Sequence, residues 1–226
     1  MKKSLEDHAA RFDEVAGEYD DSQNDTDEYR ACVSLVVDHA VGEARSASES
    51  PSGQRPRGPS GSDTVVDLGT GTGAIALALA DDASEVVGRD ISEGMMEQAR
   101  KKADEQGIGN VEFGEGRFRE PNVDSDRAVD VVVSNFAMHH LSDAEKREAI
   151  EAIAELGPRK FVLGDVMFFG TPDPDEPFYS PEVDDPSTVG HLADALTDAG
   201  FALTAVERVH EQVGVLVAER GTSSQK

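Results

Sequence analysis

Apolar residues recur along the chain with two spacings, which together predict alternating strands and helices. Short runs rich in β-branched residues favour buried strands, and apolar positions three and four residues apart favour helices. The expected strands are 64–68, 85–88, 111–113, 128–134, 161–166, 202–206 and 213–218, and the expected helices between them are 74–80, 92–106, 142–156 and 187–199. Strands that are apolar throughout are typical of a parallel sheet with helices on both faces. We therefore expect an α/β fold with a doubly wound, mostly parallel sheet and a closing antiparallel pair.

The segments outside this alternation divide the chain further. Residues 1–45 have apolar positions at helical spacing in two groups, separated by Gly17 and the acidic stretch 20–27, and we interpret them as an N-terminal helical lid. In residues 46–62, 12 of 17 are Ser, Gly or Pro, a composition that predicts a flexible insertion. The main domain is expected over 63–220, followed by a short tail, 221–226.

The net charge of the chain restricts its possible partners more than its length does. The 226 residues include 46 Asp and Glu but only 21 Lys and Arg, which gives a formal net charge of −25. A surface this negative repels phosphates and argues against a nucleic-acid partner. The Lys-poor, Asp-rich balance resembles that of cytoplasmic proteins from salt-loving microbes, in which molar salt screens such repulsion.

Other features narrow the class of protein. Cys32 is the single cysteine, which excludes an internal disulfide and a cysteine-based zinc cluster. The longest run without a charge, 68–80, has 13 residues, too short for a membrane helix. Residues 1–7 turn acidic at once, so no secretory signal is expected. We expect a cytoplasmic protein without a membrane partner.

A glycine-rich loop follows the first strand and is the main candidate for a ligand site. The sequence 69–73 reads Gly-Thr-Gly-Thr-Gly, so Gly69, Thr70, Gly71 and Gly73 lie between a strand and a helix N-terminus. Such a loop lets the backbone approach a ligand closely. A loose match to the dinucleotide fingerprint is present, but Asp67 opposes it, because a carboxylate beside the loop repels a pyrophosphate and attracts an ammonium group.

Asp90 supplies a second anchor. It ends the second strand, 21 residues after Gly69, where an acid can accept hydrogen bonds from ribose hydroxyls; a simple role at the start of the next helix is the alternative. A ligand with a cationic amino-acid end and a nucleoside without phosphate suits both acids. S-adenosylmethionine is such a ligand.

These residues also carry a family resemblance. The segments VVDLGTGTG (65–73), VVGRDISEGMMEQARKK (86–102) and VDVVVSNFAMHHL (129–141) resemble successive motifs of class I S-adenosylmethionine-dependent methyltransferases. RFDEVAGEYD (11–20) and FVLGDVMFF (161–169) resemble parts of the small-molecule branch, which includes ubiquinone and menaquinone methyltransferases. The resemblance implies a Rossmann-like sheet of seven strands with an antiparallel last strand.

The resemblance also implies roles for individual residues. Asp67 and the glycine loop would hold the methionine part of the cofactor and Asp90 its ribose. The residues implied beside the adenine and the sulfonium are Ile91, Met95, Gly116, Arg117, Phe118, Asn135 and Phe136, with Tyr19 closing over the cofactor. Arg117 departs from the family pattern, which usually has an acid there; Glu115 or a backbone carbonyl would have to replace that acid.

The candidate catalytic residues are His139 and His140, just past the fourth strand. Methyl transfer needs a general base only when the nucleophile carries a proton. Adjacent side chains diverge, so one histidine at most is expected to face the acceptor, with a slight preference for His140; helix-capping or core histidines are the alternative. No metal site is expected, because no third ligand stands at a suitable spacing.

The function expected from these observations is methyl transfer to a small-molecule acceptor. The alternatives are a cofactor-binding protein that acts on a macromolecule or lacks catalysis, and a nicotinamide-dependent oxidoreductase. The sequence leaves the acceptor and the number of subunits open. Residues 134–137 lack the motif typical of enzymes that methylate amino groups of bases, and aromatic residues in 167–186 are candidates for a pocket wall.

Overall fold

The computed structural model describes residues 5–22, 26–41, 61–172 and 177–220. Most of the expected insertion, residues 46–60, and the expected tail, 221–226, lie outside the described residues. In the described part, no helix combines the length and the apolar character needed to cross a membrane.

The elements alternate as the hydrophobic pattern predicts. The helices are α1 (Leu5–Val15), α2 (Tyr19–Ser22), α3 (Asp27–Val41), α5 (Ala74–Leu79), α6 (Glu93–Gln106), the 3₁₀ turn η1 (Met138–His140), α7 (Asp143–Glu155) and α8 (Val189–Asp198). The strands are β1 (Thr64–Leu68), β2 (Glu85–Asp90), β3 (Val111–Glu115), β4 (Val131–Asn135), β5 (Lys160–Phe168), β6 (Ser187–Thr188), β7 (Ala202–His210) and β8 (Val213–Glu219).

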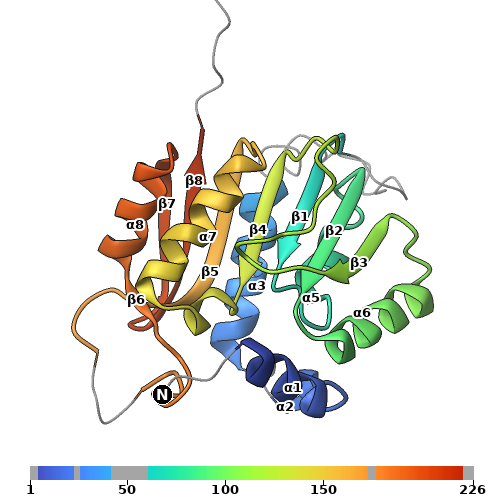
Figure 1. Ribbon diagram of the computed structural model, residues 1–226, viewed down its shortest axis with the longest axis horizontal. Helices are drawn as coiled ribbons and strands as arrows, with labels where there is room; N and C mark the ends of the chain where they lie inside the picture. Colours follow the sequence, from blue (N-terminus) through green and yellow to red (C-terminus); the bar gives the residue numbers. More distant parts are fainter. Residues whose placement is uncertain (1–4, 23–25, 42–60, 173–176, 221–226) are drawn as a thin grey trace, which may run out of the picture.

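One twisted sheet organises the molecule (Figure 1). Its strand order is β3-β2-β1-β4-β5-β8-β7, and the short β6 pairs with β5 beside this path. The first five strands of the path are parallel, β8 runs antiparallel to β5, and β7 pairs antiparallel with β8. The expected fold class is confirmed: a doubly wound, mostly parallel sheet closed by an antiparallel hairpin.

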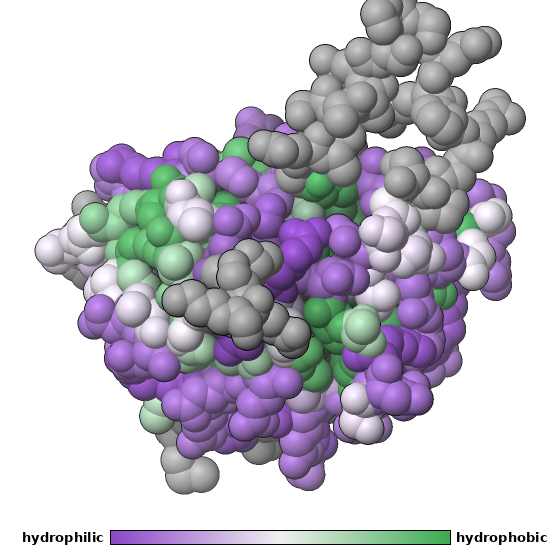
Figure 2. All heavy atoms as spheres, turned by 90° about the horizontal axis from the view of Figure 1, so that it is seen from above, coloured by the Kyte–Doolittle hydropathy of each residue, from purple (hydrophilic) through white to green (hydrophobic). Residues whose placement is uncertain are grey.

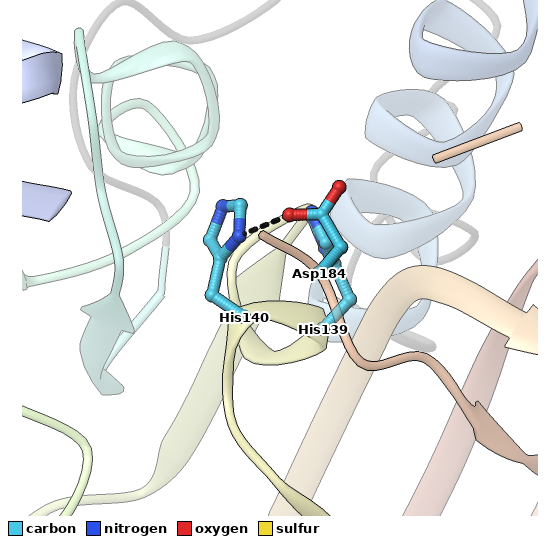
Figure 3. A group of neighbouring side chains, drawn as sticks. All are labelled: His139, His140 and Asp184. Atoms are coloured by element: carbon cyan, nitrogen blue, oxygen red, sulfur yellow. Dashed lines mark hydrogen bonds and ion pairs between the residues drawn. The ribbon is translucent and has the colours of Figure 1, made fainter. Parts of the chain in front are cut away.

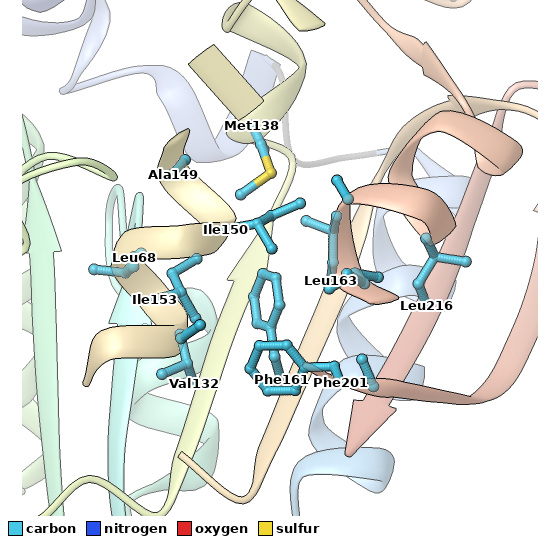
Figure 4. Packing of buried hydrophobic residues seen from close by; sticks show 14 of the residues in the cluster. Leu68, Val132, Met138, Ala149, Ile150, Ile153, Phe161, Leu163, Phe201 and Leu216 are labelled. Atoms are coloured by element: carbon cyan, nitrogen blue, oxygen red, sulfur yellow. The ribbon is translucent and has the colours of Figure 1, made fainter. Parts of the chain in front are cut away.

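Successive residues of the central strands serve two separate cores, because side chains alternate across a strand. Val66, Val132 and Phe161 face α7 and α8, where they meet Ile150 and Leu196 (Figure 4). Their neighbours in sequence face α3 and α5: Val65, Val131 and Val162 pack there. Burial on both faces explains why these strands read as continuous apolar runs.

The sequence located most helix boundaries correctly. Ser92 caps α6 by accepting a hydrogen bond from Met95 N at 3.1 Å, and Gly107 ends that helix with φ of 69°. Ser142 and Glu145 form the expected capping box at the start of α7.

Several expected boundaries are wrong, and β7, for example, continues to His210. The strand predicted over 128–134 begins only at Val131, because Asp130 instead exchanges hydrogen bonds with the backbone of Thr64. The helix predicted from Ser187 begins at Val189 with Thr188 as its cap, since Ser187 and Thr188 pair with β5. Part of the acidic stretch predicted to separate two helices forms α2, a single helical turn.

The topology brings the ends of β1, β2 and β4 to one edge of the sheet, where the predicted site residues lie. In Figure 1, α1 and α2 lie beside this edge, on the side where the arrowheads of β1 and β4 point. Two N-terminal helices therefore lie next to the carboxyl ends of the parallel strands, which is the usual place for ligands in such sheets.

Candidate functional site

The glycine loop after β1 turns sharply because three of its residues adopt left-handed backbone conformations. Gly69, Gly71 and Gly73 have φ of 72°, 53° and 83°, a region that L-residues with a side chain rarely occupy. A Cβ atom at Gly69 would lie 2.4 Å from that of Ala137, so the loop passes close to the segment that follows β4. At Gly71 a Cβ would meet nothing within 4 Å. Glycine at position 71 thus keeps space open above the loop.

Asp67 lies beneath this loop and is almost fully buried. The Thr70 hydroxyl donates to its Oδ2 at 2.7 Å, whereas Oδ1 has no hydrogen-bond partner within the described residues. Burial raises the pKa of Asp67 to about 7, and the hydrogen bond from Thr70 opposes this rise. A carboxyl group in this state gains stability from a cationic partner, as the sequence predicted for the methionine end of a ligand.

Asp90 ends β2 and ties two backbone segments together. Its Oδ2 accepts from Gly71 N at 2.8 Å and its Oδ1 from Ser92 N at 2.9 Å. Burial raises the pKa of Asp90, and these backbone donors counteract part of the rise. Asp90 therefore has the alternative role at the start of the next helix, because it binds the N-cap residue Ser92. It also lines the cavity.

A cavity of about 460 Å³ collects almost all of the predicted cofactor residues. Its lining includes Tyr19, Asp67, Gly69, Thr70, Gly71, Asp90, Ile91, Met95, Gly116, Arg117, Phe118, Asn135, Phe136 and His140. Gly73 and His139 are the two predicted site residues that are not part of this lining. Gly73 instead packs against α6, where an added Cβ would lie 3.0 Å from that of Ala99.

The backbone is strained at Phe136, which follows β4 and lines the cavity. Phe136 has φ of 51°, which is uncommon for a bulky residue and costs about 1–3 kcal/mol. Its backbone N–H donates to Gly164 O at 2.8 Å, and its ring contacts Tyr29 at 5.4 Å between centroids. Asn135 is buried beside it, and both side-chain amide atoms lack partners within the described residues. Both residues line the cavity, and the Asn135 amide offers a donor and an acceptor to a ligand.

The N-terminal helices supply residues that the sequence did not assign to the site. His8, Phe12 and Tyr29 all line the cavity together with the predicted Tyr19. Phe12 contacts Tyr19 at 6.2 Å and His140 at 5.5 Å between ring centroids. Sequence periodicity places Phe12 on an apolar helix face. Because His8 and Phe12 are four residues apart, the sequence also indicates that their rings share this face.

Two carboxylates fasten these helices to the cofactor loops. Asp13 of α1 accepts from Ser92 Oγ at 2.6 Å and from Gly94 N at 2.9 Å, in the first turn of α6. Asp20 of α2 accepts from Thr72 Oγ1 at 2.6 Å and forms an ion pair with Lys102. Both contacts join the N-terminal segment directly to the elements that carry Asp90 and the glycine loop.

The two candidate histidines have different surroundings (Figure 3). His139 is buried, its Nδ1 lies 2.6 Å from Asp165 Oδ1, and its backbone N–H donates to Asp165 Oδ2 at 3.0 Å. Burial lowers its pKa, but the Asp165 carboxylate outweighs burial, so the pKa of His139 is raised. His139 thus has the surroundings of a core histidine, which is the alternative to a catalytic role for this pair.

His140 borders the cavity, and its Nδ1 lies 2.7 Å from Asp184 Oδ1. Burial, together with the neighbouring charge of His139, lowers the pKa of His140 to about 4. This geometry supports the slight preference for His140. No sequence pattern indicated Asp184, which lies in the loop between β5 and β6.

Three possible metal ligands lie within 4.8 Å of one another: a ring nitrogen of each histidine and a carboxylate oxygen of Asp184. These distances are short enough for the three groups to bind one cation. The hydrogen bond between His140 and Asp184 accounts for this proximity, and the expectation of no metal site stays a prediction.

The expected pocket wall in 167–186 is absent from the described lining. None of the aromatic residues in this segment borders the cavity; Phe178 instead packs behind Phe136 at 6.4 Å. On the adenine side, Phe118 lines the cavity, whereas Glu115 points to solvent and does not replace the acid missing at Arg117.

Comparisons with known proteins agree with this geometry. Residues 65–157 match the family model described as a methyltransferase domain. An uncharacterized methyltransferase, YcgJ of Bacillus subtilis, is 35% identical over 103 residues, which cover 45% of this chain and 40% of YcgJ. The release factor glutamine methyltransferase of Aliivibrio fischeri is 45% identical over 74 residues, 32% of this chain and 26% of that protein. The chain thus spans less than half the length of these relatives.

A solved structure resembles nearly the whole chain. Magnesium protoporphyrin IX methyltransferase from Synechocystis PCC 6803, with bound S-adenosylhomocysteine, superimposes with a TM-score of 0.67 at 21% identity and covers 94% of this chain and 95% of its own. That likeness establishes the fold, and the family match covers the glycine loop, Asp90 and both histidines. Residues 65–157 are therefore similar to a methyltransferase domain, and the chain has the Rossmann-like fold of solved methyltransferases.

Proposed function

We propose that this protein transfers the methyl group of S-adenosylmethionine to a small-molecule acceptor. One observation carries the proposal: Asp67, the glycine loop, Asp90 and His140 line a single cavity. Asp67 would attract the ammonium group of the cofactor, and Asp90 would accept hydrogen bonds from its ribose. Because the sulfonium is already an activated leaving group, much of the rate can come from alignment within the cavity.

His140 is the residue that we propose as the general base. Its ring borders the cavity, whereas His139 does not. The proposed acceptor would lie between Phe136 and α1, in line with the methyl group and the sulfur atom. His139 would then support the site from the core through its bond to Asp165.

A macromolecular acceptor is the second candidate, since one relative is named for a release-factor substrate. The cavity argues for the small acceptor, because α1 and α2 contribute Phe12 and Tyr19 to its wall and so narrow the approach to His140.

Binding of S-adenosylhomocysteine tests the cofactor site with a matched pair of variants. Gly71→Ala and Gly107→Ala both force alanine into a left-handed conformation with open space around it, but only Gly71 borders the cavity. We expect each to lose about 1–2 kcal/mol of stability. Calorimetry should show at least a tenfold loss of affinity in Gly71→Ala and no loss in Gly107→Ala. Tight NAD binding by the wild type, or equal affinities in both variants, would contradict the proposed cofactor.

A further inference from the structure

The loop between β5 and β6 places a carboxylate against the proposed base. We propose that Asp184 is the positioning residue that fixes the tautomer of His140, and that the acceptor is a neutral hydroxyl compound; this inference rests on the proposed function. Asp184 Oδ1 lies 2.7 Å from His140 Nδ1, so the Nδ1–H donates to the carboxylate and the proton-free nitrogen is Nε2. Figure 3 shows that nitrogen on the side of the ring that faces away from Asp184.

Backbone contacts hold Asp184 in place without help from His140. Its second oxygen, Oδ2, accepts from Ser180 N at 2.8 Å. The next residue, Asp185, donates its N–H to His139 O at 2.7 Å. Lys146, buried in α7, donates to Leu141 O at 2.7 Å and also to Asp185 O, and so joins the loop to the histidine turn. The carboxylate is thus presented to His140 by the fold itself.

His140 and His139 together lower the pKa of Asp184 and so favour its charged form. His139 Nε2 lies 3.9 Å from Asp184 Oδ1, and its Nδ1 is bonded to Asp165. Although burial raises the pKa of Asp184, the hydrogen bond from His140 and the charge of His139 outweigh burial, and the net shift is downward. The titratable and charged groups around this arrangement include His8, Arg11, Tyr19, His139, Glu145, Lys146 and Asp165.

The same surroundings select the charge of the acceptor. The buried carboxylates Asp165 and Asp184 disfavour an anionic acceptor such as a carboxylate. Phe12 and Phe136 provide apolar walls. A neutral hydroxyl group on an apolar body satisfies these conditions, and unlike a carboxylate it needs a base.

The reaction step balances without any further reactant. His140 Nε2 takes the hydroxyl proton, and a lone pair of the acceptor oxygen forms the new O–C bond. The S–C bond breaks, and its electron pair stays on sulfur, which gives S-adenosylhomocysteine. The resulting imidazolium of His140 is neutralised by Asp184 until the proton passes to water.

Two phenols of different acidity test the proposal. With 4-methylphenol, which is protonated at pH 8, we expect Asp184→Asn to lower kcat by ~100-fold or more, within the usual range for general-base catalysis. With 4-nitrophenol, which is largely ionised at that pH, kcat should fall less than threefold. Asp184→Glu should recover part of the loss. Glu182→Gln removes an exposed carboxylate from the same loop and should leave both rates unchanged.

Other results would overturn the inference. Equal losses with both phenols would assign Asp184 a merely structural role, and no loss with either would remove it from the site. Methylation of amines or carboxylates but of neither phenol would exclude the hydroxyl acceptor. A rate that chelators abolish and zinc restores would make His140 and Asp184 metal ligands. Failure to bind S-adenosylhomocysteine would instead refute the proposed function itself.

Nitrogen NMR of the histidines tests the tautomer without any acceptor. In the wild type, the His140 signals should report a protonated Nδ1 and a proton-free Nε2 at pH 7. Asp184→Asn should shift the population toward the Nε2–H form or a mixture. Unchanged signals in that variant would contradict the positioning role.

Discussion

At the scale of single residues, Asp67 is the clearest case of a buried group whose burial would favour ligand binding. A buried carboxyl with only one hydrogen-bonded oxygen is costly in the empty protein. Burial raises the pKa of Asp67 to about 7, so the group titrates in the range in which cells operate. A cationic ligand would compensate the charge, and the cost in the empty site would then favour binding.

The pH dependence of cofactor binding follows from this carboxyl. Below pH 7 Asp67 is mostly protonated and attracts an ammonium group weakly; above pH 7 it is ionised. We therefore expect the affinity for S-adenosylhomocysteine to rise by about tenfold, or ~1.4 kcal/mol, between pH 5.5 and pH 8. Calorimetry at several pH values measures this change.

Two variants separate Asp67 from other titrating groups. Asp67→Asn should bind more weakly at pH 8, by ~1.5–3 kcal/mol, and should lose most of the pH dependence. Asp126→Asn removes an exposed carboxylate and should behave like the wild type. An unchanged pH profile in Asp67→Asn would exclude Asp67 as the source.

At the scale of elements, two carboxylates join the N-terminal helices to the segments that carry Asp90 and Gly71. Asp13 of α1 binds the first turn of α6, where the free backbone N–H of Gly94 and the helix dipole favour an anion. Asp20 of α2 binds Thr72 and Lys102. Two carboxylates thus attach residues 5–22 beside the cavity, and the lid expected over 1–45 stays a prediction.

Weakening this attachment should change binding kinetics more than stability. We expect the double variant Asp13→Ala, Asp20→Ala to release S-adenosylhomocysteine at least fivefold faster, while the melting temperature of the sheet domain changes little. Hydrogen exchange of residues 5–22 should accelerate in the same variant. Glu14→Gln, an exposed neighbour on α1, is the matched control. Unaltered release kinetics in the double variant would show that these helices do not gate the cavity.

At the scale of the whole molecule, charge dominates the surface. Hydrophilic residues cover most of the face in Figure 2, with apolar residues in smaller groups between them. With a net charge of −25, most carboxylates have no cation to pair with. Mutual repulsion therefore opposes folding in dilute buffer, and molar salt, with a Debye length of ~3 Å, screens it.

Stability should accordingly depend on salt. We expect the melting temperature to rise by ~4–8 °C from dilute buffer to molar KCl, which corresponds to about 2 kcal/mol for a chain of this size. Replacing the exposed acids Glu97, Asp104, Glu151 and Glu155 by Lys should reduce that dependence. A melting temperature that stays flat or falls with KCl would show that acidity does not limit stability.

The sequence by itself determined most of the elements and the proposed cofactor residues, because both depend on local chemistry. Val65 and Val66 are apolar and pack into opposite cores, as expected of a strand buried on both faces. The capping box marks the start of α7, and the left-handed turns of the loop require Gly69 and Gly71. Asp67 and Asp90 are readable because they stand at fixed distances from that loop in the chain, and the parallel sheet brings strand ends together.

Only the tertiary structure decided the surroundings of His140, where we propose that the acceptor binds. Asp184 lies 44 residues from His140 in the chain, and a loop without periodicity brings the two side chains to 2.7 Å. His8 and Phe12 read as part of an ordinary helix, and their place in the cavity wall depends on how α1 docks through Asp13. The choice between two adjacent histidines likewise depends on Asp165, which holds His139 in the core and leaves His140 to the cavity. Contacts between distant segments carry no periodic signal, and the folded chain alone fixes them.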